Sequence, residues 1–281
     1  MSQAKIVSLL TTHNEERNIE AAIRSIVPLT TSILVIDSYS TDRTTEIVQS
    51  LAQTLNLDLD LVSREYKSPS DQKNWGIERI IAKYKTDKGL LYILILDADE
   101  MLTEDLIAEL KAEVGLQSAD CYYLPRANHF MGRFIKHSNW YPDYNLRFFK
   151  AGTAQYEDVK VHEHMIPNGR VKYLKSPMIH NTYTSISQYI ERMNRYTDWE
   201  VDNLQLKRNK LSQMGRMRKV FYSLPGRPLL RALYMYFFRL GFLDGKQGFH
   251  LAVLSGFYEF VANLKSFYRN ETDRLNVKEH E

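Results

Sequence analysis

Two aspartates separated by one alanine, Asp97 and Asp99, are the residues whose type and spacing most clearly suggest chemistry. They follow the apolar run 90–96, which has the composition of a buried strand. Carboxylate oxygens bind hard divalent cations, and a cation held there can neutralise the diphosphate of a nucleotide. A second pair with the same spacing, Asp58 and Asp60, lies in an alternating pattern and is interpreted as one face of an ordinary strand.

The residues before Asp97 alternate between strand and helix patterns. Short apolar runs are separated by segments whose apolar residues recur every three or four positions, as on one face of a helix. This alternation predicts an α/β fold with a mostly parallel sheet and helices on both faces. The expected strands cover 6–10, 33–36, 57–62 and 90–96, and the expected helices cover 19–26, 47–55 and 70–84.

Polar residues follow three of these expected strands. Asn14 and Glu15 come after the first strand, Asp37 after the second, and Asp97 and Asp99 after the fourth. Ligands of such sheets bind beyond the carboxyl ends of the strands. We therefore expect the three polar groups to converge on one binding site.

Composition limits the other classes of function. The chain has 281 residues, a net charge of +3 and a single cysteine, Cys121, so it forms no internal disulfide and fits a reducing compartment. Residues 1–5 lack the features of a signal peptide, which leads us to expect a cytoplasmic protein. Neither a Gly-x-Gly after the first strand nor a Walker loop is present, which argues against nicotinamide dehydrogenases and P-loop enzymes.

Four motifs together resemble glycosyltransferase family 2, whose members have the GT-A fold. They are Thr12-x-Asn14-Glu15, Val35-Ile36-Asp37-Ser38-x-Ser40-x-Asp42-x-Thr44, Gln72-Lys73-Asn74 and Leu96-Asp97-Ala98-Asp99-Glu100. The resemblance extends from residue 4 to about residue 265. Three later motifs resemble the branch of bacterial lipopolysaccharide-core β-glucosyltransferases, namely Trp140 to Phe149, Val161-His162-Glu163 and Arg239 to Gly245.

The resemblance implies a GT-A nucleotide-sugar-binding fold with a C-terminal helical extension. We expect the catalytic domain in 1–200, a basic and aromatic helical extension in 201–268, and a charged tail in 269–281. The resemblance also implies an inverting, metal-dependent transfer of a sugar from a UDP-sugar to a saccharide hydroxyl. The sugar is expected to be glucose. The acceptor is expected to be a lipid-linked glycan of the cell envelope, such as the lipopolysaccharide core.

The resemblance also implies a divalent cation, Mn²⁺ or Mg²⁺, as cofactor. Asp99 is the firmer expected ligand, Asp97 lies nearer the ribose, and His180 completes the site in many GT-A enzymes. An imidazole ligand would favour manganese. A structural role for His180 at the end of a strand is the alternative.

The expected donor site includes Asp37, whose carboxylate would accept a hydrogen bond from the uracil N–H. Capping of the following helix is the alternative role for its segment, and also for Asn14 and Glu15. Lys73 and Arg147 would offset the diphosphate charge, and Arg147 could instead contact Asp143. The complete expected donor set is Asn14, Glu15, Asp37, Ser38, Lys73, Asp97, Ala98 and Arg147.

Two further assignments leave alternatives open. The catalytic base is expected to be Glu163, by resemblance to the branch, or Asp158, which belongs to a literal Glu-Asp pair. Trp140 and Tyr141 would bind the acceptor by stacking on a sugar ring, or would pack in the core.

A basic stretch runs from Lys207 to Arg239, with nine basic residues, no acidic residue and many aromatic and leucine side chains. This mixture favours contact with an anionic membrane surface, as a peripheral protein on the inner face of the plasma membrane. Arg231 and Arg239 interrupt the apolar run, so it is not expected to span. Packing on the catalytic domain is the alternative, and nucleic-acid binding is not expected because nothing else supports it.

Two other functions share the fold. A sugar nucleotidyltransferase would ordinarily carry a glycine-rich loop after the first strand, and Thr11 to Asn14 is not one. A non-catalytic scaffold or saccharide-binding protein would have lost acidic motifs that are all present here.

Overall fold

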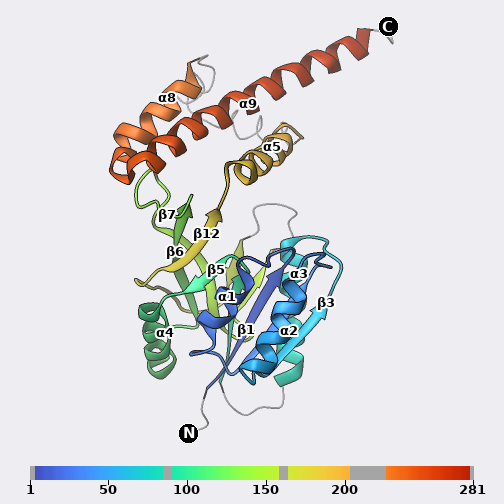
Figure 1. Cartoon of the computed structure of the whole chain (residues 1–281), viewed down its shortest axis with the longest axis vertical. Coiled ribbons are helices and arrows are strands. Elements are labelled where there is room, and N and C mark those ends of the chain that lie inside the picture. Colours follow the sequence, from blue (N-terminus) through green and yellow to red (C-terminus); the bar gives the residue numbers. More distant parts are fainter. Residues whose placement is uncertain (1–3, 85–89, 158–163, 203–225, 279–281) are drawn as a thin grey trace. The chain divides into compact units, whose positions relative to one another are not determined.

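The computed structural model describes residues 4–84, 90–157, 164–202 and 226–278 (Figure 1). The expected bases Asp158 and Glu163 lie outside these residues, as does most of the basic stretch. Two compact units are present. The first contains Met1–Ala127 and Pro142–Asn181, and the second contains Asn128–Tyr141 and Thr182–Glu281. The expected domain boundaries at 200 and 268 differ from these limits and stay a prediction.

The first unit begins with the expected strand and helix alternation (Figure 1). Four parallel strands lie in the order β3-β2-β1-β4, which confirms the α/β fold. Helices cover both faces because alternate side chains of each strand point to opposite sides. The strands are β1 Lys5–Thr12, β2 Ser32–Asp37, β3 Leu59–Ser63 and β4 Leu91–Asp97, and the helices are α1 Ile19–Ile26, α2 Thr44–Thr54 and α3 Pro69–Tyr84.

The sheet continues beyond β4 with strands that run largely antiparallel, in the order β4-β8-β6-β12-β5. Short strands β7 and β11 pair with β6, and β9 pairs with β10 in a separate two-stranded sheet. The sheet is therefore mixed, with its parallel half at the N-terminus. The bounds are β5 Glu100–Leu102, α4 Glu104–Leu116, β6 Cys121–Phe130, β7 Arg133–Phe134, β8 Asp143–Lys150, β9 Ala154–Tyr156, β10 Met165–Pro167, β11 Val171–Tyr173 and β12 Met178–Tyr183.

Two apolar cores form on the two faces of the sheet. Leu10 of β1 packs into the core that contains Ile23 of α1, whereas Leu9 packs into the core that contains Ile77 of α3. Gly76 sets the distance of α3 from the sheet, because a Cβ at this position would lie 2.6 Å from a methyl carbon of Leu9. The absence of a side chain at Gly76 therefore lets α3, which carries Lys73, lie close against the sheet.

The second unit contains the helices that follow β12, and its buried apolar residues form a separate core that includes Phe130, Met193 and Leu251. Gly256 of α9 allows close packing on α8, because a Cβ there would lie 2.5 Å from the carbonyl oxygen of Pro228. These helices confirm the expected helical extension. The bounds are α5 Ile186–Asp202, α8 Arg227–Leu233, the π-helix η1 Tyr234–Phe238, the 3₁₀-helix η2 Gly241–Asp244 and α9 Gly245–Lys278.

The motif from Arg239 to Gly245 forms the reversal between α8 and α9. Leu240 adopts a left-handed backbone conformation, with φ of 57°, that turns the chain. The buried carboxylate of Asp244 accepts hydrogen bonds from the backbone N–H groups of Lys136 and His137. The motif therefore fixes the loop that precedes Trp140. Among the described helices, none is both long and apolar enough to cross a bilayer.

Candidate active site

Two carboxylates lie at the carboxyl ends of the strands that flank β1. Asp37 ends β2 opposite Thr12, and Asp97 ends β4 opposite Thr11. The side chain of Asp37 is buried and accepts hydrogen bonds from the backbone N–H and the hydroxyl of Ser40. These bonds leave acceptor capacity on Asp37, because a carboxylate has about four lone-pair sites.

Hydrogen bonds of expected donor residues connect the loops after β1 and β2 to neighbouring segments. Asn14, in a left-handed conformation with φ of 55°, accepts a hydrogen bond from the backbone N–H of Thr41 at 2.8 Å. The backbone N–H of Glu15 donates to the hydroxyl of Thr44 at 2.8 Å. Ser38 accepts a hydrogen bond from the amide of Gln72 at 2.9 Å. Asn14 and Glu15 therefore have at least a structural function at this edge.

Asp97 carries two cationic partners. The ammonium of Lys73 lies 2.9 Å from Oδ1, and the guanidinium Nη2 of Arg147 lies 2.6 Å from Oδ2. Both cations are buried, whereas Asp97 is about one-third exposed. Residues from α3, β4 and β8 thus form one compact group of opposite charges at the strand end.

Glu100 completes this group, which we call the charge cluster: Lys73, Asp97, Glu100 and Arg147. Its side chain has no exposed surface and accepts a hydrogen bond from Nη2 of Arg147 at 2.6 Å. It also accepts one from the backbone N–H of Asp97 at 3.0 Å. Arg126 lies 3.4 Å from Glu100 and pairs with Asp143 at 2.7 Å, so a second guanidinium borders the cluster.

Pairing within the cluster keeps Asp97 and Arg147 charged. Burial disfavours the ionised form of Asp97, but Arg147 and Lys73 outweigh burial and hold the pKa of Asp97 well below its usual range. Burial likewise acts against the charge of Arg147, but Asp97 and Glu100 raise the pKa of Arg147 well above its usual value. Asp97 and Arg147 therefore act as fixed charges near neutral pH.

Asp99 and His180 approach one another beside the cluster. Nε2 of His180 lies 3.5 Å from Oδ2 of Asp99, because β12 pairs with β5 and places His180 opposite Glu100. A carboxylate oxygen and an imidazole nitrogen form a donor pair that suits Mn²⁺. Among the residues that the structure describes, no three or more His, Cys, Asp or Glu side chains are grouped to hold a metal. A cation at this pair would therefore need further ligands, such as substrate oxygens.

A polar cavity of about 310 Å³ opens beside the cluster. Cationic, tyrosine and amide side chains surround it, a combination that can bind an anionic and hydroxyl-bearing ligand. Its lining residues are Lys73, Asp97, Tyr123, Arg126, Tyr144, Asn145, Leu146, Arg147, Tyr156, His164 and Met165. Within the described part of the chain, the buried Nε of Arg147 has no hydrogen-bond partner.

The remaining expected site residues have other surroundings. Ala98 is buried in the core that contains Leu10. In the second unit, Trp140 meets Phe130 edge-to-face at 6.2 Å, and Tyr141 meets Phe134 at 5.2 Å. These aromatic contacts give both residues a packing role, and acceptor binding stays a prediction.

Sequence reasoning missed Glu100 and Arg126. Glu100 directly follows Asp99, but a carboxylate next to a metal motif is easily assigned to the motif itself. Arg126 stands within the apolar strand β6, where a charged residue needs a partner. A charged residue within an apolar strand could have indicated a buried ion pair, although not the identity of the partner.

Comparison with known proteins agrees with this geometry. The sequence profile described as glycosyl transferase family 2 matches residues 9–168. The lipopolysaccharide core biosynthesis glycosyltransferase LpsC of Rhizobium meliloti is 25% identical over 261 residues, which cover 92% of this chain and 90% of the relative. An uncharacterized glycosyltransferase of Rickettsia typhi is 23% identical over 271 residues, which cover 92% of this chain and 85% of that protein.

Among solved structures, the mannosyltransferase PcManGT from Pyrobaculum calidifontis, in complex with GDP-Man and Mn²⁺, has a similar fold. Its TM-score is 0.52 at 15% identity, with 94% of this chain and 87% of that chain covered. This likeness agrees with the expected GT-A fold. The profile match covers more than half of the chain and spans the strand ends that carry Asp37 and Asp97. The chain therefore belongs to glycosyltransferase family 2.

Proposed function

We propose that this protein transfers glucose, with inversion, from UDP-glucose to a hydroxyl of a lipid-linked saccharide of the cell envelope. Its place of action would be the cytoplasmic face of the plasma membrane, where such an acceptor is accessible. The observation that carries the proposal is the charge cluster beside a polar cavity, at the carboxyl end of β4 in a family 2 chain.

The donor would lie across the strand ends. Asp37, at the end of β2, would accept a hydrogen bond from the uracil N–H. Lys73 and Arg147 would stabilise the negative charge that develops on the leaving diphosphate, since such charges are worth most where water is excluded. Asp97 and Glu100 would hold these two cations in place, which avoids reorganisation during the reaction.

A divalent cation would be held by Asp99 and His180, with Asp97 contributing where its cationic partners allow. When bound, the cation would supply further charge neutralisation of the diphosphate. The similar mannosyltransferase was solved with Mn²⁺.

The acceptor hydroxyl would lose its proton to a carboxylate as it attacks the sugar. We assign this general base to Glu163, with Asp158 as the alternative residue. Trp140 and Tyr141 would position the acceptor by stacking. A single in-line displacement needs this alignment of base, hydroxyl and leaving group.

The first test is a thermal-shift panel of UDP, UDP-glucose, UDP-N-acetylglucosamine and GDP-mannose, with and without Mn²⁺. A ligand at 100 times its dissociation constant adds about 2.7 kcal/mol of stability, which corresponds to roughly 5–10 °C here. We expect the largest shift with UDP-glucose and Mn²⁺, and its loss in Asp99→Asn. Asp58→Asn, in the other Asp-x-Asp pair, is the matched control and should behave as the wild type.

A shift only with GDP-mannose would contradict the proposed donor, but it would agree with the assignment as a glycosyltransferase. No shift with any nucleotide would favour a scaffold protein instead. For the base, Glu163→Gln should lower transfer about 10²–10⁴-fold and keep the donor-induced shift. Normal transfer by Glu163→Gln, together with loss in Asp158→Asn, would reassign the base to Asp158.

A further inference from the structure

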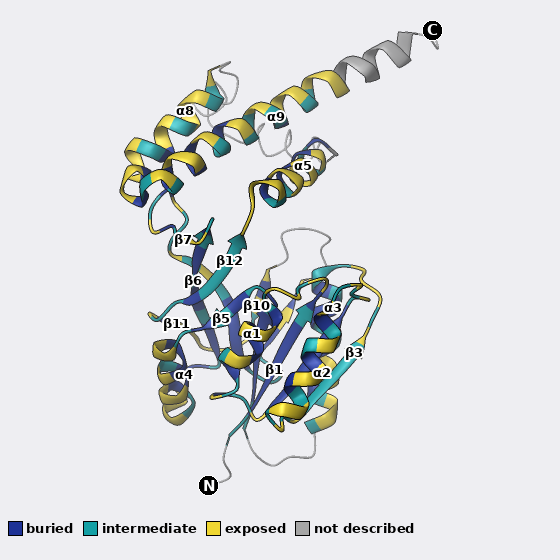
Figure 2. Ribbon diagram, viewed as in Figure 1, coloured by how far each residue is buried: buried dark blue, intermediate teal, exposed yellow. Residues whose placement is uncertain are grey.

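The second unit exposes a continuous series of apolar side chains. Along α9, exposed apolar residues recur every three or four positions, which places them on one face of the helix. On α8 and η1, Leu229, Leu233 and Phe237 follow the same spacing. Figure 2 colours exposed residues along the described length of both helices. The α9 series is Phe249, Val253, Phe257, Phe260, Leu264 and Phe267.

The reversal between α8 and α9 carries the most exposed of these groups. Phe238 is 78% exposed, and Phe242 and Leu243 are each about half exposed. Exposed apolar surface of this extent marks an interaction site, because it is costly to leave in water. We call the exposed apolar side chains of Leu229–Phe267 the apolar surface.

Within residues 229–267, the exposed charged side chains are basic. Arg231, Arg239 and Lys246 are exposed. The two acidic residues of the same segment are engaged within the unit, since Asp244 is buried and Glu259 pairs with Arg227 at 2.6 Å. A second copy of the chain would place like charges against each other, whereas an anionic surface would neutralise them.

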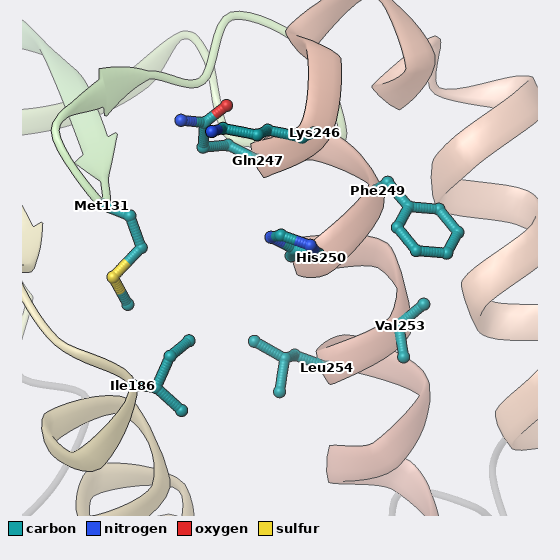
Figure 3. Close-up of a pocket in the computed structure, with 8 residues that line it drawn as sticks. All are labelled: Met131, Ile186, Lys246, Gln247, Phe249, His250, Val253 and Leu254. Carbon is teal, nitrogen blue, oxygen red and sulfur yellow. The ribbon is translucent and has the colours of Figure 1, made fainter.

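An apolar cavity of about 620 Å³ adjoins the apolar surface and shares Phe249 and Val253 with it. Figure 3 shows Met131 and Ile186 facing His250 and Leu254 across this cavity. Lys246 also lines it. An apolar hollow with a cation beside it matches a phospholipid, which combines acyl chains with an anionic headgroup.

We propose that the α8–α9 reversal and the apolar face of α9 form the docking surface for an anionic phospholipid bilayer. The aromatic side chains enter the region between headgroups and acyl chains, and Arg231, Arg239 and Lys246 contact the headgroups. This inference rests on the place of action proposed above and names the surface that attaches there. Vesicle binding and donor binding are measured separately, so a failure of attachment is distinguishable from a failure of sugar transfer.

Co-sedimentation of the full chain with vesicles tests the proposal. One set contains equal parts of phosphatidylcholine and phosphatidylglycerol, and the other contains phosphatidylcholine alone. We expect the wild type to bind the anionic vesicles and to lose binding at high salt. The double variant Phe238→Ser/Phe242→Ser should bind at least about tenfold more weakly. Leu116→Ser/Val171→Ser, at exposed positions of the first unit, is the matched control and should bind as the wild type.

A charge variant gives an independent result should the serine variant lose its fold. Arg231→Glu/Lys246→Glu should weaken binding to anionic vesicles about tenfold or more, and Lys111→Glu in α4 should not. Donor-induced thermal shifts should be unchanged in every variant. Failure of the wild type to bind anionic vesicles, or unchanged binding by both double variants, would overturn the proposal. So would a dimer of the wild type that Phe238→Ser/Phe242→Ser dissociates without any vesicle binding, because the surface would then join two copies.

Discussion

The first unit buries charged side chains, whereas the second exposes apolar ones. Lys73, Glu100 and Arg147 are nearly inaccessible in the first unit, and most of the large exposed apolar side chains lie in the second. Both arrangements are unfavourable by themselves, the first because charged groups lose their hydration and the second because apolar surface stays in water. The buried charges are paired within the unit, which offsets their loss of hydration. The apolar surface has no covering element in the described residues.

This difference bears on function. A buried ion pair contributes little net stability compared with apolar packing, so its presence at a strand end favours a role in binding. An exposed apolar surface favours contact with another phase or molecule. The first unit therefore has the features of a binding site for a charged ligand, and the second has the features of an interaction surface.

Phenylalanine-to-alanine substitutions in the two units should lower the free energy of unfolding by very different amounts. Phe148 is fully buried and stacks on Tyr92 at 5.0 Å, so Phe148→Ala should lower the free energy of unfolding by about 3–5 kcal/mol. Phe238→Ala, at an exposed position, should change it by about 0.5 kcal/mol or less. Urea unfolding of the two variants measures the contrast. A large loss in Phe238→Ala would mean that Phe238 is covered in solution.

Removing one buried charge should lower the free energy of unfolding less than Phe148→Ala does, but more than a substitution at the surface. Glu100→Gln leaves the Arg147 guanidinium with one anionic partner, and we expect a loss of about 3 kcal/mol together with weaker donor binding. Glu104→Gln, at an exposed position of α4, is the control and should stay within about 0.5 kcal/mol. Equal unfolding midpoints for the two variants would show that Glu100 is not essential to the cluster.

Substitution of two helical glycines by alanine compares a closely packed position in the second unit with an open position in the first. Gly256→Ala would push a Cβ against the Pro228 carbonyl and should destabilise the second unit by about 1–3 kcal/mol. A Cβ at Gly115, in α4 of the first unit, meets nothing within 4 Å, so Gly115→Ala should stabilise by up to about 1 kcal/mol. Thermal unfolding distinguishes the signs, and a stabilised Gly256→Ala would contradict the close packing of α8 on α9.

The smallest expected effect is a pH dependence in the first unit. Hydrogen bonds from Lys150 and Arg170 lower the pKa of Asp120 below its usual value. A lowered folded-state pKa stabilises the fold above the unfolded value of about 3.9, and this contribution is lost as the pH falls further. Asp120→Asn should therefore cost about 1 kcal/mol at pH 7, and the difference from the wild type should shrink below about pH 4. A constant difference down to pH 3 would exclude this linkage.

The strand ends could be predicted because local patterns determine them. The apolar runs before Asp37 and Asp97, and the helical spacing from Ile19 to Ile26, depend on neighbouring residues alone. The burial of Lys73 could not be predicted, since lysines on helices usually face water. It follows from the close approach of α3 at Gly76, which depends on Leu9 and Ile36 from two other elements.

The sequence alone therefore determined the order of strands and helices in the first half of the chain, the position of the acidic residues at strand ends and the resemblance to the family. Only the tertiary structure decided which cations neutralise Asp97, that Glu100 is buried beneath them, and that Asp99 meets His180. The reason is physical. Periodicity is a local property, whereas electrostatic pairing depends on distances between residues that lie far apart in the chain, such as Lys73, Asp97 and Arg147.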